Sequence, residues 1–335
     1  MKLFIQIPCL NEENTLPEVI ASIPHEIQGI DEIYTLVIDD GCTDKTADIA
    51  QSIGVDYIVK NRHVLGLARS FCRGIEVALE LGADIIVNLD GDNQYKASDI
   101  PALIQPILDK QADIVVGCRD IDGHKEFSPL KKSLQKFGSK VVCELANVEL
   151  PDVTSGFRAL HASAAKHLSI MSTFSYTLEM LCQATRLGLK TTWIPVGVNP
   201  KRRESRLFRS TAEFIYQQCK TFGFVFLVYY PIRFFGWLTI ISGGMTVLLG
   251  LWYFQRLSTT THTIHFVSGT FLVISFLTTI LLLLATLLGS VLSHLHRILL
   301  DTRSRVRTVQ IKQGITMHDY ALTTAPEFFR WKQKL

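Results

Sequence analysis

Short apolar runs alternate with amphipathic stretches over the first 120 residues. Runs of the length of a buried strand occur at 2–7, 34–38, 57–59, 85–89 and 114–116. Helices are predicted between them, at 14–23, 44–53, 68–81 and 98–108. Strands and helices that alternate in such short units indicate a mostly parallel sheet covered on both faces. Further on, the pattern predicts helices at 130–146 and 176–187 and a strand at 191–196.

The C-terminal third has a different pattern. No charged side chain occurs in 234–254 or in 266–293, and each stretch exceeds the ~20 residues that a membrane-spanning helix needs. The joining segment, 255–265, has Arg256 as its only fixed charge, whereas 201–233 carries seven Lys or Arg. The two stretches therefore predict a multi-pass cell-membrane protein with two spans, and the positive-inside rule places their joining segment outside. Its N-terminal domain and both termini would lie in the cytoplasm.

These patterns predict four regions. They are an α/β domain at 1–210, an interfacial amphipathic helix region at 211–231, two transmembrane helices at about 232–254 and 266–293, and a cytosolic tail at 294–335. A lone hairpin buries little apolar surface, so a homo-oligomer is a possible assembly. The net charge of +3 is too small to indicate nucleic acid as a partner. Seven scattered cysteines without a Cys-x-x-Cys pair indicate reduced thiols rather than disulfides or zinc ligands.

Polar side chains gather where the predicted strands end, and one more opens a helix. They are Pro8, Asn11 and Glu12, Asp39 and Asp40, Asp90 and Asp92, Arg119, and Arg69 on the first turn of a helix. In an open α/β sheet the carboxyl ends of the strands form the edge where ligands bind. The set as a whole therefore predicts one site at that edge.

Each group in this set suits one part of a nucleotide sugar. Asp39 and Asp40 can accept hydrogen bonds from the N–H groups of a base, and Arg69 can pair with a phosphate oxygen. Asp90 and Asp92 supply hard oxygen ligands for Mg²⁺ or Mn²⁺ shared with a diphosphate. Taken alone, either Asp-rich segment is also typical of an ordinary solvated turn.

The same residues resemble the motifs of family 2 glycosyltransferases with the GT-A fold. The matching segments are Ile7-Pro8-x-x-Asn11-Glu12, Asp39-Asp40-Gly41-Cys42-Thr43-Asp44, Gly66, Asp90-x-Asp92-x-Gln94, Gly117-x-Arg119 and Ser155-Gly156-Phe157-Arg158. Cys42 stands where the family usually has Ser. With its two C-terminal spans the chain is similar to the polyprenyl-phosphate glycosyltransferases.

The resemblance implies a fold and a set of roles. The fold would be GT-A, a Rossmann-like, mostly parallel sheet in a cytosolic domain, followed by a transmembrane hairpin. Residues that would contact the donor nucleotide are Pro8, Asn11, Glu12, Asp39, Asp40, Arg69 and Asp90. Asp90 and Asp92 would hold the metal with Gln94 beside it, and Arg119 and Arg158 would meet phosphates near the reacting centre.

An ionised lipid phosphate is an acceptor that needs no general base, but it needs cations and a membrane. Five arginines before the spans could supply the cations: Arg119, Arg158, Arg202, Arg203 and Arg206. The predicted reaction is a single displacement with inversion, in which the metal held by Asp92 stabilises the departing nucleoside diphosphate. If a base is used after all, Asp152 is the candidate. The predicted partners are thus a nucleotide-sugar donor and undecaprenyl or dolichyl phosphate.

Other interpretations stay open at this point. The acceptor could be a hydroxyl of a lipid or a polysaccharide, although the Gln-x-x-Arg-Trp motif of processive synthases is not found at the expected place. The chain could also be a non-catalytic membrane scaffold that binds a nucleotide sugar. The basic cluster at 202–209 could simply be attracted to anionic lipids.

Overall fold

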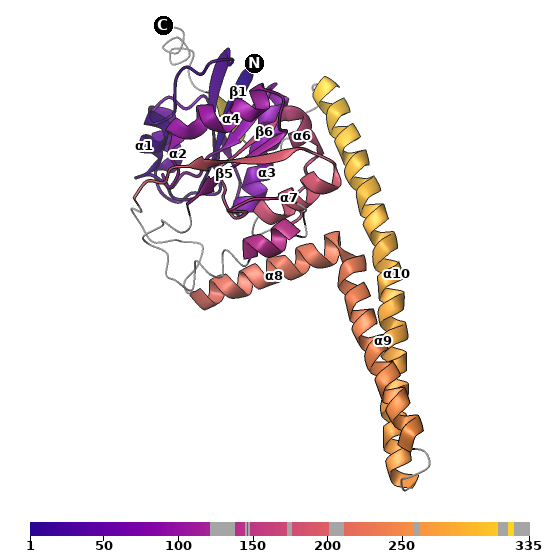
Figure 1. Cartoon of the computed structure of the whole chain (residues 1–335). Coiled ribbons are helices and arrows are strands. Elements are labelled where there is room, and N and C mark those ends of the chain that lie inside the picture. The colour runs from indigo at the N-terminus through magenta and orange to yellow at the C-terminus, as the bar shows by residue number, and fades with distance from the viewer. Residues whose placement is uncertain are drawn as a thin grey trace. The chain divides into compact units, whose positions relative to one another are not determined.

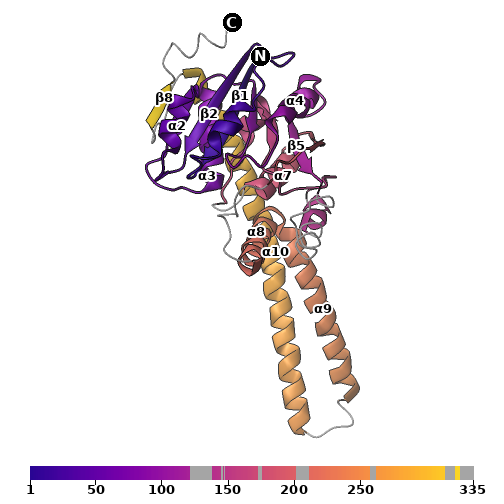
Figure 2. The ribbon, with the colours of Figure 1, turned by 90° about the vertical axis from the view of Figure 1, so that its left-hand side faces the viewer.

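The computed structural model describes residues 1–120, 138–144, 146, 148–172, 176–200, 211–256, 262–313 and 321–324. The chain divides into two compact units (Figures 1 and 2). The first contains Met1–Gln217 together with Leu300–Leu335, and the second is Gln218–Leu299.

The first unit is built on an eight-stranded sheet with the order β7-β5-β6-β4-β1-β2-β3-β8. Its strands are β1 (Lys2–Cys9), β2 (Glu32–Asp39), β3 (Tyr57–Lys60), β4 (Ile85–Asn88), β5 (Ile114–Arg119), β6 (Arg158–His161), β7 (Thr191–Val196) and β8 (Ala321–Thr324). β1 pairs in parallel with β2 and β4, β2 with β3, and β5 with β7. The mostly parallel sheet is therefore confirmed. The sequence pattern had missed the two antiparallel strands, β6 between β4 and β5, and β8 at the outer edge of β3.

Helices cover both faces of this sheet, because alternate residues of each strand enter two separate apolar layers. Leu3, Ile5 and Ile7 of β1 lie in the layer shared with α1 (Leu16–Ala21), α2 (Thr46–Ser52) and α4 (Ile100–Leu108), the last preceded by a 3₁₀ turn at Ala97–Asp99. Phe4 lies in the other layer, with α3 (Leu67–Glu80), α6 (Ala162–His167) and α7 (Thr177–Arg186). Residues 138–144 are also helical.

The C-terminal segment is part of the first unit rather than a separate tail. The long helix α10 (His262–Gln313) ends with turns that contact α3 and the end of α6. Arg307 donates to Glu76 Oε1 (2.8 Å) and to the carbonyl of Leu168 (3.2 Å), and Ser304 contacts His167 (2.7 Å). β8 then pairs with β3, so the region predicted as a tail at 294–335 contributes a helix end and an edge strand.

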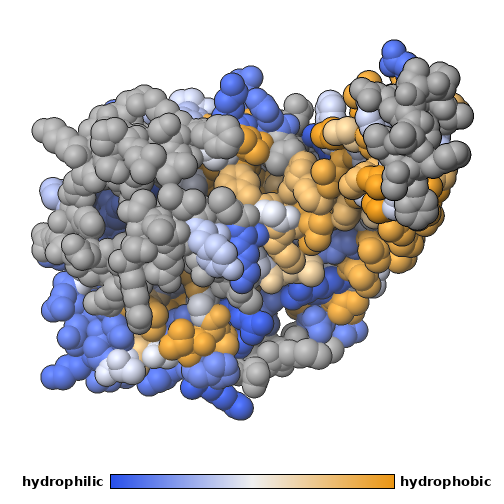
Figure 3. All heavy atoms as spheres, turned by 90° about the horizontal axis from the view of Figure 1, so that it is seen from below, coloured by the Kyte–Doolittle hydropathy of each residue, from blue (hydrophilic) through white to orange (hydrophobic). Residues whose placement is uncertain are grey.

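The second unit is a helical hairpin. It contains the end of α8 (Thr211–Tyr229), then α9 (Pro231–Arg256) and most of α10. Two helical stretches are long and apolar enough to cross a membrane, Pro231–Gln255 and Val267–Ile311. Large apolar side chains stay exposed along both, and Figure 3 shows such side chains at the surface.

Hydroxyl groups join the two helices of the hairpin. Ser242 Oγ lies 2.8 Å from Thr279 Oγ1, and Thr246 Oγ1 lies 2.7 Å from Ser275 Oγ. Interhelical hydrogen bonds of this kind hold helices together where the surroundings offer no hydrophobic driving force.

Candidate active site

Asp39, at the end of β2, offers one free acceptor. Its side chain is fully buried, and Oδ1 accepts the backbone N–H of Cys42 at 2.7 Å. Among the described residues Oδ2 has no hydrogen-bond partner. A buried carboxylate oxygen without a partner is costly, so this atom fits a ligand N–H such as that of a nucleobase.

The carboxylate of the neighbouring Asp40 accepts hydrogen bonds from within the protein. Oδ1 accepts from the backbone N–H of Leu65 (2.8 Å) and from Asn61 Nδ2 (3.0 Å), while Oδ2 accepts from Gly66 N–H (2.9 Å). Asp40 thus orders segment 61–66, and Gly66, with φ +90°, then starts α3. The structure therefore gives Asp40 a role in shaping the loop, and its contact with the nucleoside stays a prediction. Arg69 lies exposed on the first turn of α3.

The loop after β1 braces its two neighbours. Asn11, which has φ +58°, accepts the Thr43 N–H on Oδ1 at 2.8 Å. Thr15 Oγ1 lies 2.9 Å from Glu12 Oε2 and 2.7 Å from the carbonyl of Gly91. Glu12 is therefore linked through Thr15 to the turn that carries Asp90 and Asp92. Pro8 lies in β1 beside this turn, since a Cβ built on Gly91 would come within 3.4 Å of its carbonyl oxygen.

Asp90 and Asp92 follow β4 on a tight turn. Asp90 Oδ1 lies 3.4 Å from Asn88 Nδ2, and Asp92 Oδ1 accepts the Gln94 N–H at 3.0 Å. Burial and the nearby carboxylate of Asp92 raise the pKa of Asp90 to about 7. A divalent cation bound between the two carboxylates would relieve their charge repulsion. Their hard oxygens, with Gln94 two residues further on, therefore fit Mg²⁺ or Mn²⁺.

This pair cannot fill a coordination sphere alone. Over the described part of the chain, no cluster of three or more His, Cys, Asp or Glu side chains could hold a metal. The remaining ligands would have to be water or phosphate oxygens, which is the usual situation for Mg²⁺.

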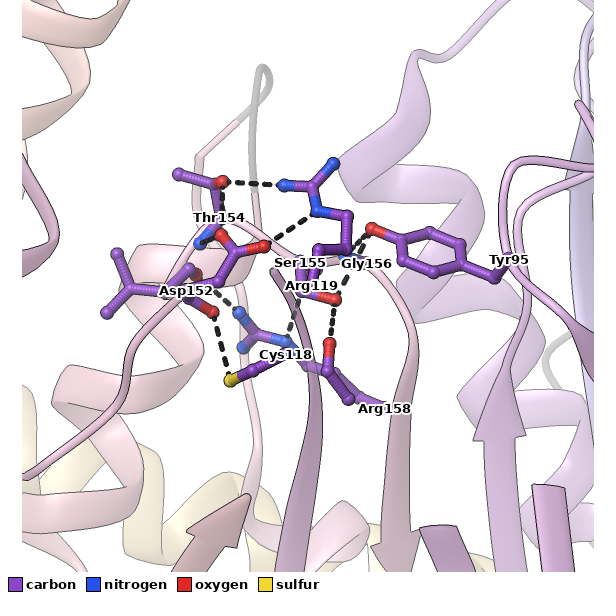
Figure 4. A network of polar contacts seen from close by, with 10 residues as sticks. Tyr95, Cys118, Arg119, Asp152, Thr154, Ser155, Gly156 and Arg158 are labelled. Atoms are coloured by element: carbon purple, nitrogen blue, oxygen red, sulfur yellow. Dashed lines mark hydrogen bonds and ion pairs between the residues drawn. The ribbon is translucent and has the colours of Figure 1, made fainter. Parts of the chain in front are cut away.

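Arg119, at the end of β5, is buried and held in a fixed position (Figure 4). Nε donates to Asp152 Oδ2 at 2.7 Å, Nη2 donates to Thr154 Oγ1 at 3.1 Å, and the guanidinium lies over the ring of Tyr95. Burial lowers the pKa of Arg119, but Tyr95 and Asp152 raise it by more, so the side chain stays charged. Nη1 has no partner among the described residues, and Figure 4 shows it turned away from Asp152.

Asp152 is the counter-ion of Arg119. Besides the ion pair, its Oδ1 accepts both the N–H and the hydroxyl of Thr154, at 3.1 and 2.7 Å. Burial raises the pKa of Asp152, but Arg119 and Thr154 lower it to a net value below the ordinary one. A general base needs a free lone pair and a pKa near the working pH. The expectation that Asp152 could act as a base therefore does not fit its surroundings.

Arg158 does not face a ligand. It is fully buried, and its nitrogens donate to the carbonyls of Ser155 (2.8 Å), Thr177 (2.9 Å) and Val153 (2.7 Å). We expected this arginine to bind phosphate, but its guanidinium instead ties the segment before β6 to the start of α7. The phosphate-binding role that we predicted for Arg158 therefore does not fit these contacts.

The segment 152–157 joins the two halves of the site. At one end it carries Asp152 and Thr154, which hold Arg119. At the other end Gly156 lies so close to Asp90 that an added Cβ would come within 2.8 Å of Oδ2. The Gly156 N–H also donates to the hydroxyl of Tyr95 (3.2 Å), which helps to fix the segment. Segment 152–157 thus connects Asp90, the predicted metal ligand, with Arg119, the predicted phosphate-binding residue.

Comparison with known proteins identifies the family. The model of "Glycosyl transferase family 2" matches residues 4–169. An uncharacterised protein of Methanocaldococcus jannaschii is 31% identical over 202 residues, which cover 58% of this chain and 80% of that protein. The chain belongs to glycosyl transferase family 2. It is therefore a glycosyltransferase.

Two relatives in the family have named activities. The UDP-N-acetylglucosamine–dolichyl-phosphate N-acetylglucosaminyltransferase of Methanococcus voltae is 31% identical over 186 residues, covering 50% of this chain and 72% of the relative. The undecaprenyl-phosphate mannosyltransferase of Micrococcus luteus is 24% identical over 206 residues, covering 58% and 83%.

A solved structure supports the GT-A fold of this family 2 enzyme. Glucosyl-3-phosphoglycerate synthase from Mycobacterium tuberculosis, in complex with Mn²⁺, UDP and glucosyl-3-phosphoglycerate, has a TM-score of 0.50 and 21% identity. The match covers 65% of this chain and 80% of that protein. At this level of identity the likeness concerns the fold.

The glycosyltransferase also has site residues that the sequence did not single out. Thr15, Asn88, Tyr95 and Thr154 contact Glu12, Asp90, Gly156 and Arg119 respectively. Asn88 was visible as a polar residue inside an apolar strand, which is a signal for a buried hydrogen bond. Arg202, Arg203 and Arg206, predicted to bind the acceptor phosphate, lie outside the described residues.

Proposed function

We propose that this glycosyltransferase moves a sugar from a nucleoside-diphosphate donor to a polyprenyl phosphate, undecaprenyl or dolichyl phosphate, with inversion at the anomeric carbon. The observation that carries the proposal is the state of Arg119. It is buried and charged, and Asp152 and Thr154 hold it while Nη1 has no partner among the described residues. The nearby carboxylate that could have served as a base is neutralised by the same arginine.

Arg119 is a cation held in a fixed position, and the carboxylate of Asp152 is already hydrogen-bonded within the protein. Such a site suits an anionic acceptor. A hydroxyl acceptor must lose a proton during the transfer, and a general base is the usual means. A phosphate monoester is already ionised, so its oxygen can attack the anomeric carbon directly while the bond to the donor diphosphate breaks. Arg119 would hold the attacking phosphate through charge-assisted hydrogen bonds. The names of the relatives from Methanococcus voltae and Micrococcus luteus support the same acceptor class.

The donor half of the proposal rests on the ends of β2 and β4. Asp39 Oδ2 would accept a base N–H, and the exposed Arg69 would reach a donor phosphate. Asp90 and Asp92 would hold Mg²⁺ or Mn²⁺, which neutralises the charge that develops on a departing diphosphate. The structural neighbour from Mycobacterium tuberculosis was crystallised with Mn²⁺ and UDP, which supports a divalent ion here.

The membrane would present the lipid. Pro231–Gln255 and Val267–Ile311 include the two proposed spans, with the 255–265 connection outside and the first unit in the cytoplasm. Arg202, Arg203 and Arg206 would add cations for the lipid phosphate. A homo-oligomer belongs to the same proposal, because one hairpin leaves most of its apolar surface uncovered.

Transfer into a lipid phase tests the proposal. The purified full chain in detergent is given a panel of radiolabelled UDP- and GDP-sugars, undecaprenyl or dolichyl phosphate, and Mn²⁺ or Mg²⁺. We expect metal-dependent label in the organic phase, and a loss of at least ~100-fold in Asp92→Asn, because the metal supplies several kcal/mol of charge stabilisation.

A matched variant controls for the loss of a carboxylate as such. Asp48→Asn removes an exposed carboxylate on α2 and should leave the rate within about twofold of the wild type. Equal rates for Asp92→Asn and Asp48→Asn would contradict the metal site, and the absence of lipid label with every donor would contradict the acceptor.

A further inference from the structure

A group of buried polar side chains lies behind Asp90, on the face of the sheet that α3 and α7 cover. Asn88, the last residue of β4, and Tyr176, just before α7, are both fully buried. Neither would contact a substrate, and neither belongs to the motifs that indicated the family. A buried amide and a buried hydroxyl in an apolar layer are stable only when their hydrogen bonds are made.

The amide of Asn88 has a defined orientation. Its Nδ2 lies 2.9 Å from the carbonyl of Gly156, 2.9 Å from the hydroxyl of Tyr176 and 3.4 Å from Asp90 Oδ1. Because a carbonyl and a carboxylate only accept, the nitrogen must be on this side. Its Oδ1 accepts from Gln6 Nε2 at 2.9 Å, which agrees with this orientation.

Tyr176 fixes the other end of the group. Its hydroxyl accepts from Asn88 and donates to the Gly156 carbonyl at 3.1 Å. Its ring stacks on Phe71 of α3 with centroids 3.7 Å apart and an interplanar angle of 5°, so the hydroxyl has little freedom to move. Gly156 in turn lies against the Asp90 carboxylate. The Asn88 amide and the Gly156 backbone thus both lie beside the Asp90 carboxylate, the amide at 3.4 Å, and the Tyr176 hydroxyl bonds to both of them.

We propose that Asn88 and Tyr176 are positioning residues that hold the Asp90 carboxylate in the orientation it needs for the divalent cation. The inference rests on the proposed function, because it takes Asp90 as a metal ligand. Hydrogen-bond partners of a ligand set its direction, and their loss commonly weakens metal binding by about 10- to 100-fold. Asn88 acts on Asp90 directly, whereas Tyr176 acts through Asn88 and Gly156.

The test measures metal binding itself. Mn²⁺ is titrated into the detergent-solubilised full chain, alone and with UDP or GDP, and bound Mn²⁺ is read from the relaxation enhancement of water protons. Tyr176→Phe keeps the ring on Phe71 and removes only the hydroxyl, so we expect Mn²⁺ affinity to fall about tenfold. Tyr34→Phe is the matched control, because it removes a hydroxyl that bonds Glu32 at 2.9 Å on an exposed part of β2. It should leave the affinity unchanged.

A second variant and a stability measurement separate positioning from folding. Asn88→Leu has a similar volume and removes the N–H that faces Asp90, so its Mn²⁺ affinity should fall further than that of Tyr176→Phe. The thermal midpoint of each variant is measured in the same buffer. If Asn88→Leu fails to fold, Tyr176→Phe decides the question alone.

The outcomes distinguish the positioning role of Asn88 and Tyr176 from the metal site itself. Wild-type Mn²⁺ affinity in a folded Tyr176→Phe, with or without a lower thermal midpoint, would overturn the positioning role and leave the metal site intact. A wild-type chain that binds no Mn²⁺ under any of these conditions would overturn the metal site, and the inference with it.

Discussion

Arg119 is the side chain on which the acceptor half of the proposed site depends. Its charge is balanced by Asp152, and the pair is almost wholly buried, with 9% and 0% of the side chains exposed. Removing one partner of such a pair leaves an uncompensated buried charge, which typically costs about 3–5 kcal/mol. Asp152 and Arg119 should therefore behave as one functional group, in which loss of either partner disables the other. If Asp152 were instead an independent base, the effects of the two losses would be separate.

A double-mutant cycle tests this unit. Arg119→Met and Asp152→Asn should each lower kcat/KM strongly, and the double variant should lose little more than the worse single one, because the second change removes a group already disabled. The measurement is lipid labelling for the four chains, with thermal midpoints to show that each is folded. Losses that multiply would contradict the account, since they would mean that Asp152 acts independently of Arg119.

The ion pair between Arg119 and Asp152 also predicts how the transfer rate of Asp152→Asn depends on pH. Since the pKa of Asp152 is held below its ordinary value, the carboxylate is ionised at any pH above about 4. The stabilisation by the pair is then fully present there, and it is lost only as the pH falls through the lowered pKa. The ratio of wild-type to Asp152→Asn rates should accordingly be the same at about pH 6 and about pH 8. A ratio that changes roughly tenfold over this interval would indicate that Asp152 titrates during the reaction.

The end of α10 acts as a brace for α3, the helix that opens beside Asp40. Arg307 is 13% exposed and bonds Glu76 of α3 as well as the carbonyl of Leu168. Arg305, two residues earlier, is 79% exposed and pairs within the helix, with Asp301. The two arginines thus offer one partly buried and one exposed ion pair on the same helix.

Replacing each arginine in turn should show how much each ion pair contributes to the free energy of unfolding. Arg307→Met should lower the free energy of unfolding by about 2 kcal/mol, because it removes charge-assisted bonds to a carboxylate and a carbonyl. For a unit of this size that corresponds to roughly 4–8 °C in the thermal midpoint. Arg305→Met should cost about 0.5 kcal/mol or less, as exposed pairs four residues apart do. Equal midpoints for the two variants would show that the brace carries no stability.

These elements also show what sequence patterns can and cannot reveal. Each parallel strand was predicted at its place, with β7 at 191–196 as expected and β1, β2 and β5 two or three residues too short, because an apolar run marks the buried part of a strand better than its ends. β6 was missed, because its four residues begin with Arg158, which looks like a ligand-binding residue until its carbonyl partners are known. β8 was missed because it is short and lies beyond the spans, so only the tertiary fold places it beside β3.

The whole chain combines an α/β unit with a hairpin that exposes apolar side chains along most of its length. Trp252, Tyr253 and Phe254 lie at the end of α9 next to the 255–265 connection, where aromatic side chains suit a membrane–water interface. Arg297, Arg303 and Arg305 lie toward the other end of α10. This asymmetry of basic residues supports the proposed topology with the connection outside.

Thiol labelling tests that topology. All seven native cysteines precede the first span, so a cysteine placed at Ser258 is the only one expected outside. In intact cells a membrane-impermeant maleimide should label Ser258→Cys and leave the wild type unlabelled. Thr302→Cys, beyond the second span, serves as the matched cytoplasmic position and should react only after the cells are opened. Labelling of the Thr302 variant in intact cells would contradict the orientation.

A comparison of two lipids that differ only in the phosphate group shows directly whether the acceptor is a phosphate. The full-length enzyme receives the active sugar donor, the divalent ion and either a polyprenyl phosphate or the corresponding polyprenol, and label in the lipid phase is counted. The proposed phosphate acceptor implies transfer to the phosphate and at most ~1% of that rate to the alcohol, because Arg119 is placed to bind an anion and its neighbour Asp152 is already bonded to Arg119 and Thr154. Comparable transfer to the alcohol would contradict it and would make the enzyme a hydroxyl glycosyltransferase.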